Sequence, residues 1–148
     1  MIERMRQGRS CAQKQVCLAL VGLLILTLVA ASGCAAAANL PGQVELSASE
    51  FDFGDIPNNG PVSHTFQIRN VGQGALEITG VSTSCGCTTA EIGSSRLTPG
   101  GVADLTVTFD PQAHGGTTGE FMRQVYVRSN DPDTPEATLT IRVTVVEP

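Results

Sequence analysis

The chain has 148 residues, 41% of them hydrophobic and 4% aromatic, with no tryptophan, which is enough apolar material for one domain with a modest core. Its formal net charge is −5, but the basic residues are concentrated at the start, and from Cys34 onward five basic residues face thirteen acidic ones, a balance of −8. An acidic body without basic clusters repels phosphate backbones, so the composition argues against nucleic-acid binding.

The first 33 residues have the layout of a secretory signal peptide. A basic segment, residues 1–15, precedes an uncharged apolar run, residues 16–31, which is shorter than the about 20 residues that a membrane-spanning helix needs. The Ala-Ser-Gly-Cys sequence that ends at Cys34 resembles the lipobox of bacterial lipoproteins, although Ala31 stands where leucine is usual. The resemblance implies that Cys34 is diacylated and becomes the mature N-terminus. An ordinary signal peptide or an uncleaved anchor is the alternative.

The cysteine count agrees with a lipid anchor. Cys11 and Cys17 leave with the signal peptide, which leaves three cysteines in the mature chain. An odd number in an exported protein needs an explanation. Lipidation of Cys34 supplies one, because it leaves Cys85 and Cys87 as a pair.

Residues 34–43 are then the lipidated cysteine and a short tether, and residues 44–148 are the domain. A tether of this length keeps the domain close to the membrane surface. We therefore expect an exported protein of the cell envelope, on the periplasmic or the surface side, whose membrane contact is its lipid.

Short β-rich runs fill the domain, and glycine, proline, asparagine and aspartate separate them. This pattern predicts an all-β, immunoglobulin-like sandwich of about seven strands, preceded by the signal-peptide helix. The expected strands are residues 44–53, 62–69, 76–82, 85–92, 103–109, 121–128 and 137–145. The two cysteines are too close in sequence to bridge two sheets, so the core must rest on phenylalanine and aliphatic side chains.

Several short motifs carry a family resemblance. They are FDFGDI at 51–56, HTFQIRNVG at 64–72, LEI at 76–78, SCGCT at 84–88, PG at 99–100 and SND at 129–131. Their order and spacing resemble the bacterial family of domains of unknown function numbered fifteen-seventy-three, which is similar to the immunoglobulin-like domains of the ciliary protein hydin. The resemblance covers about residues 44–146 and implies fold and export, but no activity.

Cys85 and Cys87 are the candidate site, and three interpretations stay open. The first is a disulfide, which an exported location favours. In an extended strand the Cα atoms of the two cysteines lie about 6.5 Å apart, and the intervening glycine lets the backbone bend and shorten that distance. Two thiolates can also chelate a soft ion, Cu(I) or Zn(II), with further ligands from His64, His114 or Met122. Thiol–disulfide exchange is the third, although its catalysts usually carry Cys-x-x-Cys at a helix N-terminus.

No paired carboxylates, phosphate loop or nucleophile–base motif is recognisable, so we expect no catalytic residues, no cofactor and no enzyme. The acidic residues at 131–133 indicate a solvated turn and not a calcium loop. We predict a lipid-anchored, non-catalytic module that binds an unidentified envelope protein or acts as a scaffold, through edge strands and end loops. The alternative is soft-metal or thiol-redox handling by Cys85 and Cys87, with His64 as a third metal ligand.

Overall fold

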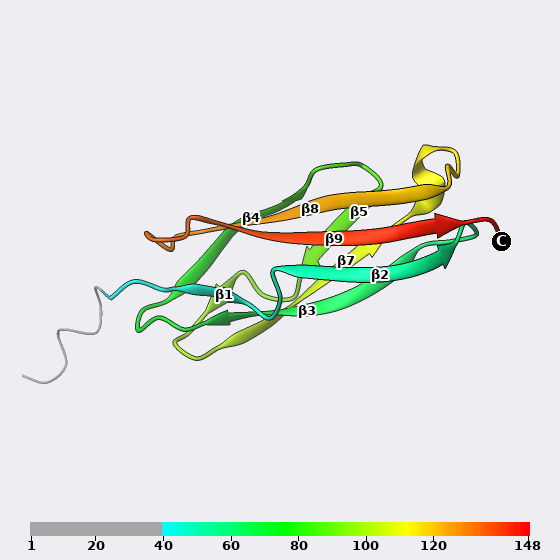
Figure 1. Ribbon diagram of the computed structural model, residues 1–148. Helices are drawn as coiled ribbons and strands as arrows, with labels where there is room; N and C mark the ends of the chain where they lie inside the picture. The colour runs from blue at the N-terminus through cyan, green and yellow to red at the C-terminus, as the bar shows by residue number, and fades with distance from the viewer. Residues whose placement is uncertain (1–39) are drawn as a thin grey trace, which may run out of the picture. The chain divides into compact units, whose positions relative to one another are not determined.

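The computed structural model describes residues 40–148, so the signal peptide and Cys34 lie outside the described residues. Nine strands and a short 3-10 helix follow one another along this part of the chain (Figure 1). Their bounds are β1 (Val44–Leu46), β2 (Glu50–Pro57), β3 (Val62–Asn70), β4 (Leu76–Thr83), β5 (Thr88–Ile92), β6 (Arg96–Leu97), β7 (Val102–Phe109), η2 (Pro111–His114), β8 (Gly119–Ser129) and β9 (Glu136–Val146). No helix within residues 40–148 has the length and apolarity to cross a membrane.

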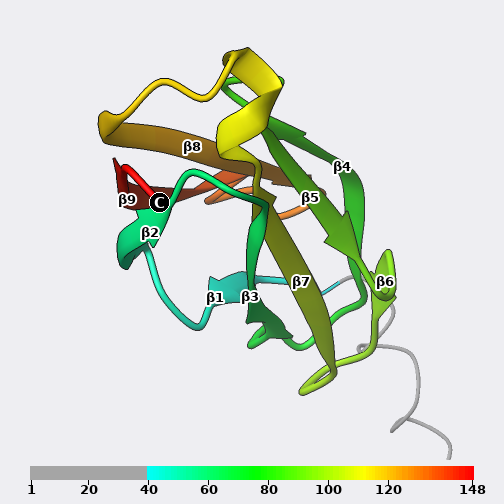
Figure 2. The same cartoon turned by 90° about the vertical axis from the view of Figure 1, so that its right-hand side faces the viewer.

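The strands form two sheets that pack face to face as a sandwich (Figures 1 and 2). One sheet has the order β1-β3-β7-β5, and the other has the order β2-β9-β8-β4-β6. All neighbouring strands are antiparallel except β2 and β9, which run parallel. The predicted all-β sandwich is therefore confirmed.

Alternation along the strands builds the core, because successive side chains of a strand point to opposite faces. In β7 every second residue from Ala103 to Phe109 is buried, and β3 buries Phe66 and Ile68 against it. In β9 every second residue from Leu139 to Val145 is buried in the same way. Each fully buried aliphatic or phenylalanine side chain stabilises the fold by about 1.5–3 kcal/mol relative to exposure.

The structure has more strands than the predicted seven. The run expected as the first strand or strand pair, residues 44–53, is divided between the sheets: β1 pairs with β3, and β2 pairs with β9. A two-residue strand, β6, pairs Leu97 with Leu76 at the edge of the second sheet. The strand expected to start at Cys85 begins at Thr88, so both cysteines precede it.

Asn70 fastens the chain where it enters the domain. Its side chain is fully buried, and its Oδ1 accepts hydrogen bonds from the backbone N–H groups of Gln43 (3.1 Å) and Gly72 (3.0 Å). Its Nδ2 donates to the carbonyls of Gly74 (2.8 Å) and Leu97 (3.0 Å). One amide therefore links the entering segment, the β3–β4 turn and β6, with no polar atom of its side chain left unsatisfied.

Asp131 is the second fastening, in the loop between β8 and β9. The sequence predicts a solvated turn here, but Asp131 is only 3% exposed, so that prediction is wrong for this residue. Its carboxylate accepts from the backbone N–H groups of Val44 (2.8 Å), Asp133 (2.9 Å) and Thr134 (3.1 Å). Burial raises the pKa of Asp131, but these three bonds outweigh it and hold the pKa below the usual value.

Candidate functional site

The two cysteines lie in the turn between β4 and β5, at the end of the sandwich away from the start of β1 (Figure 1). The N–H of Thr88 donates to the carbonyl of Cys85 at 3.2 Å, which closes a β-turn. The Thr83 hydroxyl lies 3.1 Å from the Cys85 carbonyl and 2.8 Å from the Thr88 carbonyl. The N–H of Asp110 donates to the carbonyl of Cys87 at 2.8 Å, so the backbone of the turn is held on both sides.

The two thiols differ in exposure. Cys87 is 4% exposed, whereas Cys85 is half-buried. The N–H of Cys87 donates to the sulfur of Cys85 at 3.3 Å, so the first sulfur folds back over the turn toward the second cysteine. No disulfide is present within residues 40–148, and the closed pair stays a prediction.

Arg123 is the residue that the sequence analysis missed. It lies on β8, on the same face as the buried Val125 and Val127, and its Nε donates to the sulfur of Cys87 at 3.1 Å. Its Nη1 donates to the carbonyl of Met122 at 2.8 Å, and its guanidinium carbon lies 5.1 Å from the ring centroid of Phe121. These contacts fix the cation against the thiol.

Electrostatics at the site follow from this contact. The hydrogen bond to Cys87 raises the pKa of Arg123, burial opposes the shift, and the charges of Cys87 and Cys85 add to it. A raised arginine pKa means that the site favours the cationic form of Arg123. The turn therefore has a cationic side chain in direct contact with the Cys87 sulfur.

A hollow of about 260 Å³ opens beside Cys87. Its walls are mainly apolar, and the rings of Phe109 and Phe121 lie 6.0 Å apart, centroid to centroid. Figure 2 shows η2 and the loop after it at the same end of the sandwich as the β4–β5 turn. The lining residues are Cys87, Phe109, Asp110, Pro111, Thr117, Phe121 and Arg123.

His64, the predicted third metal ligand, is not brought to the cysteines. Its ring stacks on Phe51 at 3.9 Å and meets Phe66 at 4.7 Å between centroids, and it lies on β3, with β7 between it and β5. Among residues 40–148 no group of three or more histidine, cysteine or acidic side chains is placed to hold a metal ion. The guanidinium of Arg123 beside Cys87 also opposes a second cation there.

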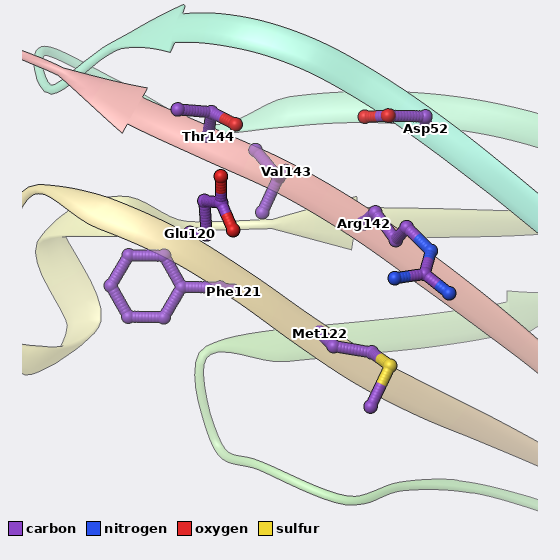
Figure 3. Close-up of a pocket in the computed structure, with 7 residues that line it drawn as sticks. All are labelled: Asp52, Glu120, Phe121, Met122, Arg142, Val143 and Thr144. Atoms are coloured by element: carbon purple, nitrogen blue, oxygen red, sulfur yellow. The ribbon is translucent and has the colours of Figure 1, made fainter.

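A larger hollow of about 370 Å³ lies on β8 and β9 (Figure 3). Arg142 is directly opposite both Met122 on β8 and Asp52 on β2, and Figure 3 shows its side chain extended beside Met122. The arginine forms an exposed ion pair with Glu50, and such pairs contribute little. The charge of Arg142 is thus paired with that of Glu50, and the residues that line the hollow include no cysteine or histidine.

β5 is an open sheet edge that begins at the cysteine turn. It pairs only with β7. The hydrogen bonds from Asp110 N–H to the Cys87 carbonyl and from Gly93 N–H to the Asp104 carbonyl show that the odd-numbered residues of this segment direct their backbone groups to β7. The N–H and C=O groups of residues 90 and 92 therefore point away from β7. The strand has no proline and no bulge, and one charged residue.

The other edges are protected. β1 has three residues and β6 has two. β2 is longer, but it carries Pro57, a register shift between Asp52 and Asp55 with Gly54 at φ 69°, and the three carboxylates of Glu50, Asp52 and Asp55. Proline, bulges and charges are the features that block strand addition to an edge. Among the four strands that end the two sheets in the described part of the chain, β5 is the one that is neither very short nor interrupted by a bulge or a proline.

These features define an immunoglobulin-like sandwich with a thiol turn at one end. Residues 44–145 match the family described as "Protein of unknown function (DUF1573)", and the chain belongs to that family. The search of curated proteins finds no match.

Solved structures agree with this fold. A protein of unknown function from Porphyromonas gingivalis W83 is 27% identical with a TM-score of 0.65, and the match covers 76% of this chain and 50% of that one. The chain thus spans about half the length of that protein. The PapD-like domain 7 of human CEP192 (13% identity, TM-score 0.56, 71% and 86% covered) and the YadV chaperone (12%, 0.53, 69% and 51%) share the fold.

Proposed function

We propose that the chain is an exported lipoprotein, anchored through Cys34, that presents a hydin-type immunoglobulin-like module at the cell envelope. The module is non-catalytic and binds an envelope protein by accepting one of its strands at β5. The observation that carries the proposal is the contrast between edges: β5 exposes unprotected backbone groups, while β1, β2 and β6 are short, bulged or charged. Strand addition to an open edge is a general mode of peptide recognition, in which main-chain hydrogen bonds supply affinity.

Ala90→Pro tests this binding mode. The substitution removes an N–H that points to the open edge, and proline is tolerated at such positions of edge strands. A photoreactive amino acid at Thr89, on exposed β5, should cross-link one defined partner in cells, and Ala90→Pro should abolish that adduct. Ala90→Val, which keeps the N–H, is the matched control and should retain it.

Two further results check the argument. The same photoreactive residue at exposed Arg142, which pairs with β2 on one side and with β8 on the other, should give no adduct with this partner. Thr89→Pro removes an N–H that bonds to β7 and should unfold the domain, unlike Ala90→Pro. An adduct that survives Ala90→Pro would refute strand addition. An adduct of two copies of this chain would refute the proposal that the partner is a different protein.

Anchoring is tested separately. Cys34→Ser should abolish incorporation of labelled fatty acid and release the protein from membranes, because no other group of the exported chain is proposed to carry the lipid. Arg142→Gln, remote in sequence from the lipobox, is the control. Fatty acid that still enters the Cys34→Ser protein would refute the lipobox assignment, whatever the result at β5.

A further inference from the structure

We propose that Cys85 and Cys87 form a thiol–disulfide exchange site in which Arg123 stabilises the thiolate of Cys87. The proposal goes beyond the binding role, because it assigns chemistry to the turn. It rests on three observations: the turn that holds the cysteines one residue apart, the 3.1 Å contact from Arg123 Nε to Cys87 Sγ, and the unequal exposure of the two thiols.

The unequal exposure gives the two sulfurs different roles. Because Cys85 is only half-buried, an incoming thiolate can reach its sulfur. Cys87, in contrast, is buried against Arg123. Exchange is faster when the departing sulfur is stabilised as a thiolate. The arginine is therefore placed on the sulfur that departs when Cys85 is attacked.

The reaction balances with a disulfide-bonded partner as co-reactant. In the oxidising direction the Cys85 thiolate attacks one sulfur of the partner disulfide, the partner's S–S bond breaks, and the first partner thiolate leaves and takes up a proton. The Cys87 thiolate then attacks Cys85, which forms the Cys85–Cys87 bond and expels the second partner thiolate. This chain loses two electrons and two protons, and the partner disulfide gains both to become two thiols.

The surroundings of the turn favour this chemistry over the other two interpretations. A guanidinium touching Cys87 repels a soft cation but stabilises an anionic sulfur. A permanent structural disulfide would leave that guanidinium without an anionic partner. The turn also closes a very small ring, and a disulfide in such a ring is more easily reduced than one that closes a long loop.

The test is a redox titration of the full-length protein in detergent with glutathione buffers of varied poise. Trypsin cleaves after Arg69 and Arg96, and the resulting peptide of residues 70–96 contains both thiols and none of the other three cysteines. Its mass reports directly whether the pair is open or closed. We expect one transition between the dithiol and a form two hydrogens lighter.

Arg123→Gln should favour the disulfide about tenfold at pH 8, because a lost hydrogen bond to a charged group is of that order, and tenfold is about 30 mV for a two-electron couple. Arg123→Lys, which keeps the charge, should lie between the two. Arg142→Gln, an exposed arginine outside this contact, is the matched control and should leave the titration unchanged.

The two cysteines should also behave differently. Cys87→Ser should accumulate a glutathione adduct on Cys85, because the resolving thiol is gone, while Cys85→Ser should react at least tenfold more slowly, because Cys87 is buried. The proposal is overturned if the peptide never becomes two hydrogens lighter at any poise, or if Arg123→Gln titrates like Arg142→Gln. Both results are independent of the cross-linking at β5.

Discussion

Replacing Asp131 should destabilise the fold in a way that depends on pH. The carboxylate is 3% exposed and accepts three backbone hydrogen bonds, but two of the donors, Asp133 and Thr134, lie in an exposed loop where water can replace it. The third donor, Val44 N–H, begins β1 and is partly buried. Leaving a buried donor unsatisfied costs about 1–3 kcal/mol, so Asp131→Ala should lower the free energy of unfolding by about 1–2 kcal/mol at pH 7, because one partly buried donor loses its acceptor.

The pH dependence gives the sharper test. The pKa of Asp131 is lowered in the folded state, so its contribution is fully present above the unfolded pKa of about 3.9 and is lost as the pH falls through the lower folded pKa. Urea unfolding of residues 39–148 should therefore show a constant difference between wild type and Asp131→Ala from pH 7 to about pH 4, and a shrinking one below. Asp133→Asn, exposed and two residues away, is the control. A difference that is below about 0.5 kcal/mol, or that does not change with pH, would refute the reasoning.

Two further substitutions test the core and the entry segment by the same urea unfolding. Phe66→Ala should cost about 3–5 kcal/mol, because the ring is 3% exposed and packs edge-on against Phe51; a value near zero would mean that the inward face of β3 is wrongly assigned. Gly74→Ala should cost at least about 1 kcal/mol, because its Cβ would lie 1.6 Å from the carbonyl oxygen of Leu40 and must displace the entry segment. Gly80→Ala, where a Cβ meets nothing within 4 Å, should be near neutral, and equal effects at the two glycines would contradict the close approach.

The strands that sequence predicts well are those whose alternation is complete. The runs 62–69, 103–109 and 137–145 are strands, and their alternate residues are buried or half-buried as expected, because a period of two is a local property. Residues 44–53 alternate too, but whether they make one strand or two depends on partners far along the chain. β1 pairs with β3, and β2 pairs with β9, about ninety residues away.

The site was only half visible in the sequence for the same reason. The spacing of Cys85 and Cys87 singled them out, but their turn is held by Thr83 and by Asp110, and Asp110 follows three strands later, at the end of β7. Arg123 lies 36 residues beyond Cys87, and no local pattern in its strand predicts that it reaches a thiol. One feature of the sequence could have indicated Arg123. It lies at the same alternate positions of its strand as the inward Val125 and Val127, and a charged residue on an inward face requires a partner.

The cysteine turn and the start of β5 lie at the end of the sandwich away from the start of β1 (Figure 1). The chain enters beside Asn70 and Asp131, and the nine residues of β3 span about 30 Å toward the end that carries the cysteine turn. The entering segment is held also by the hydrogen bond from Gly74 N–H to the carbonyl of Pro41 at 3.0 Å. The start of β5 lies at the same end as the cysteine turn, so a strand added there would bring its own neighbouring residues next to Cys85.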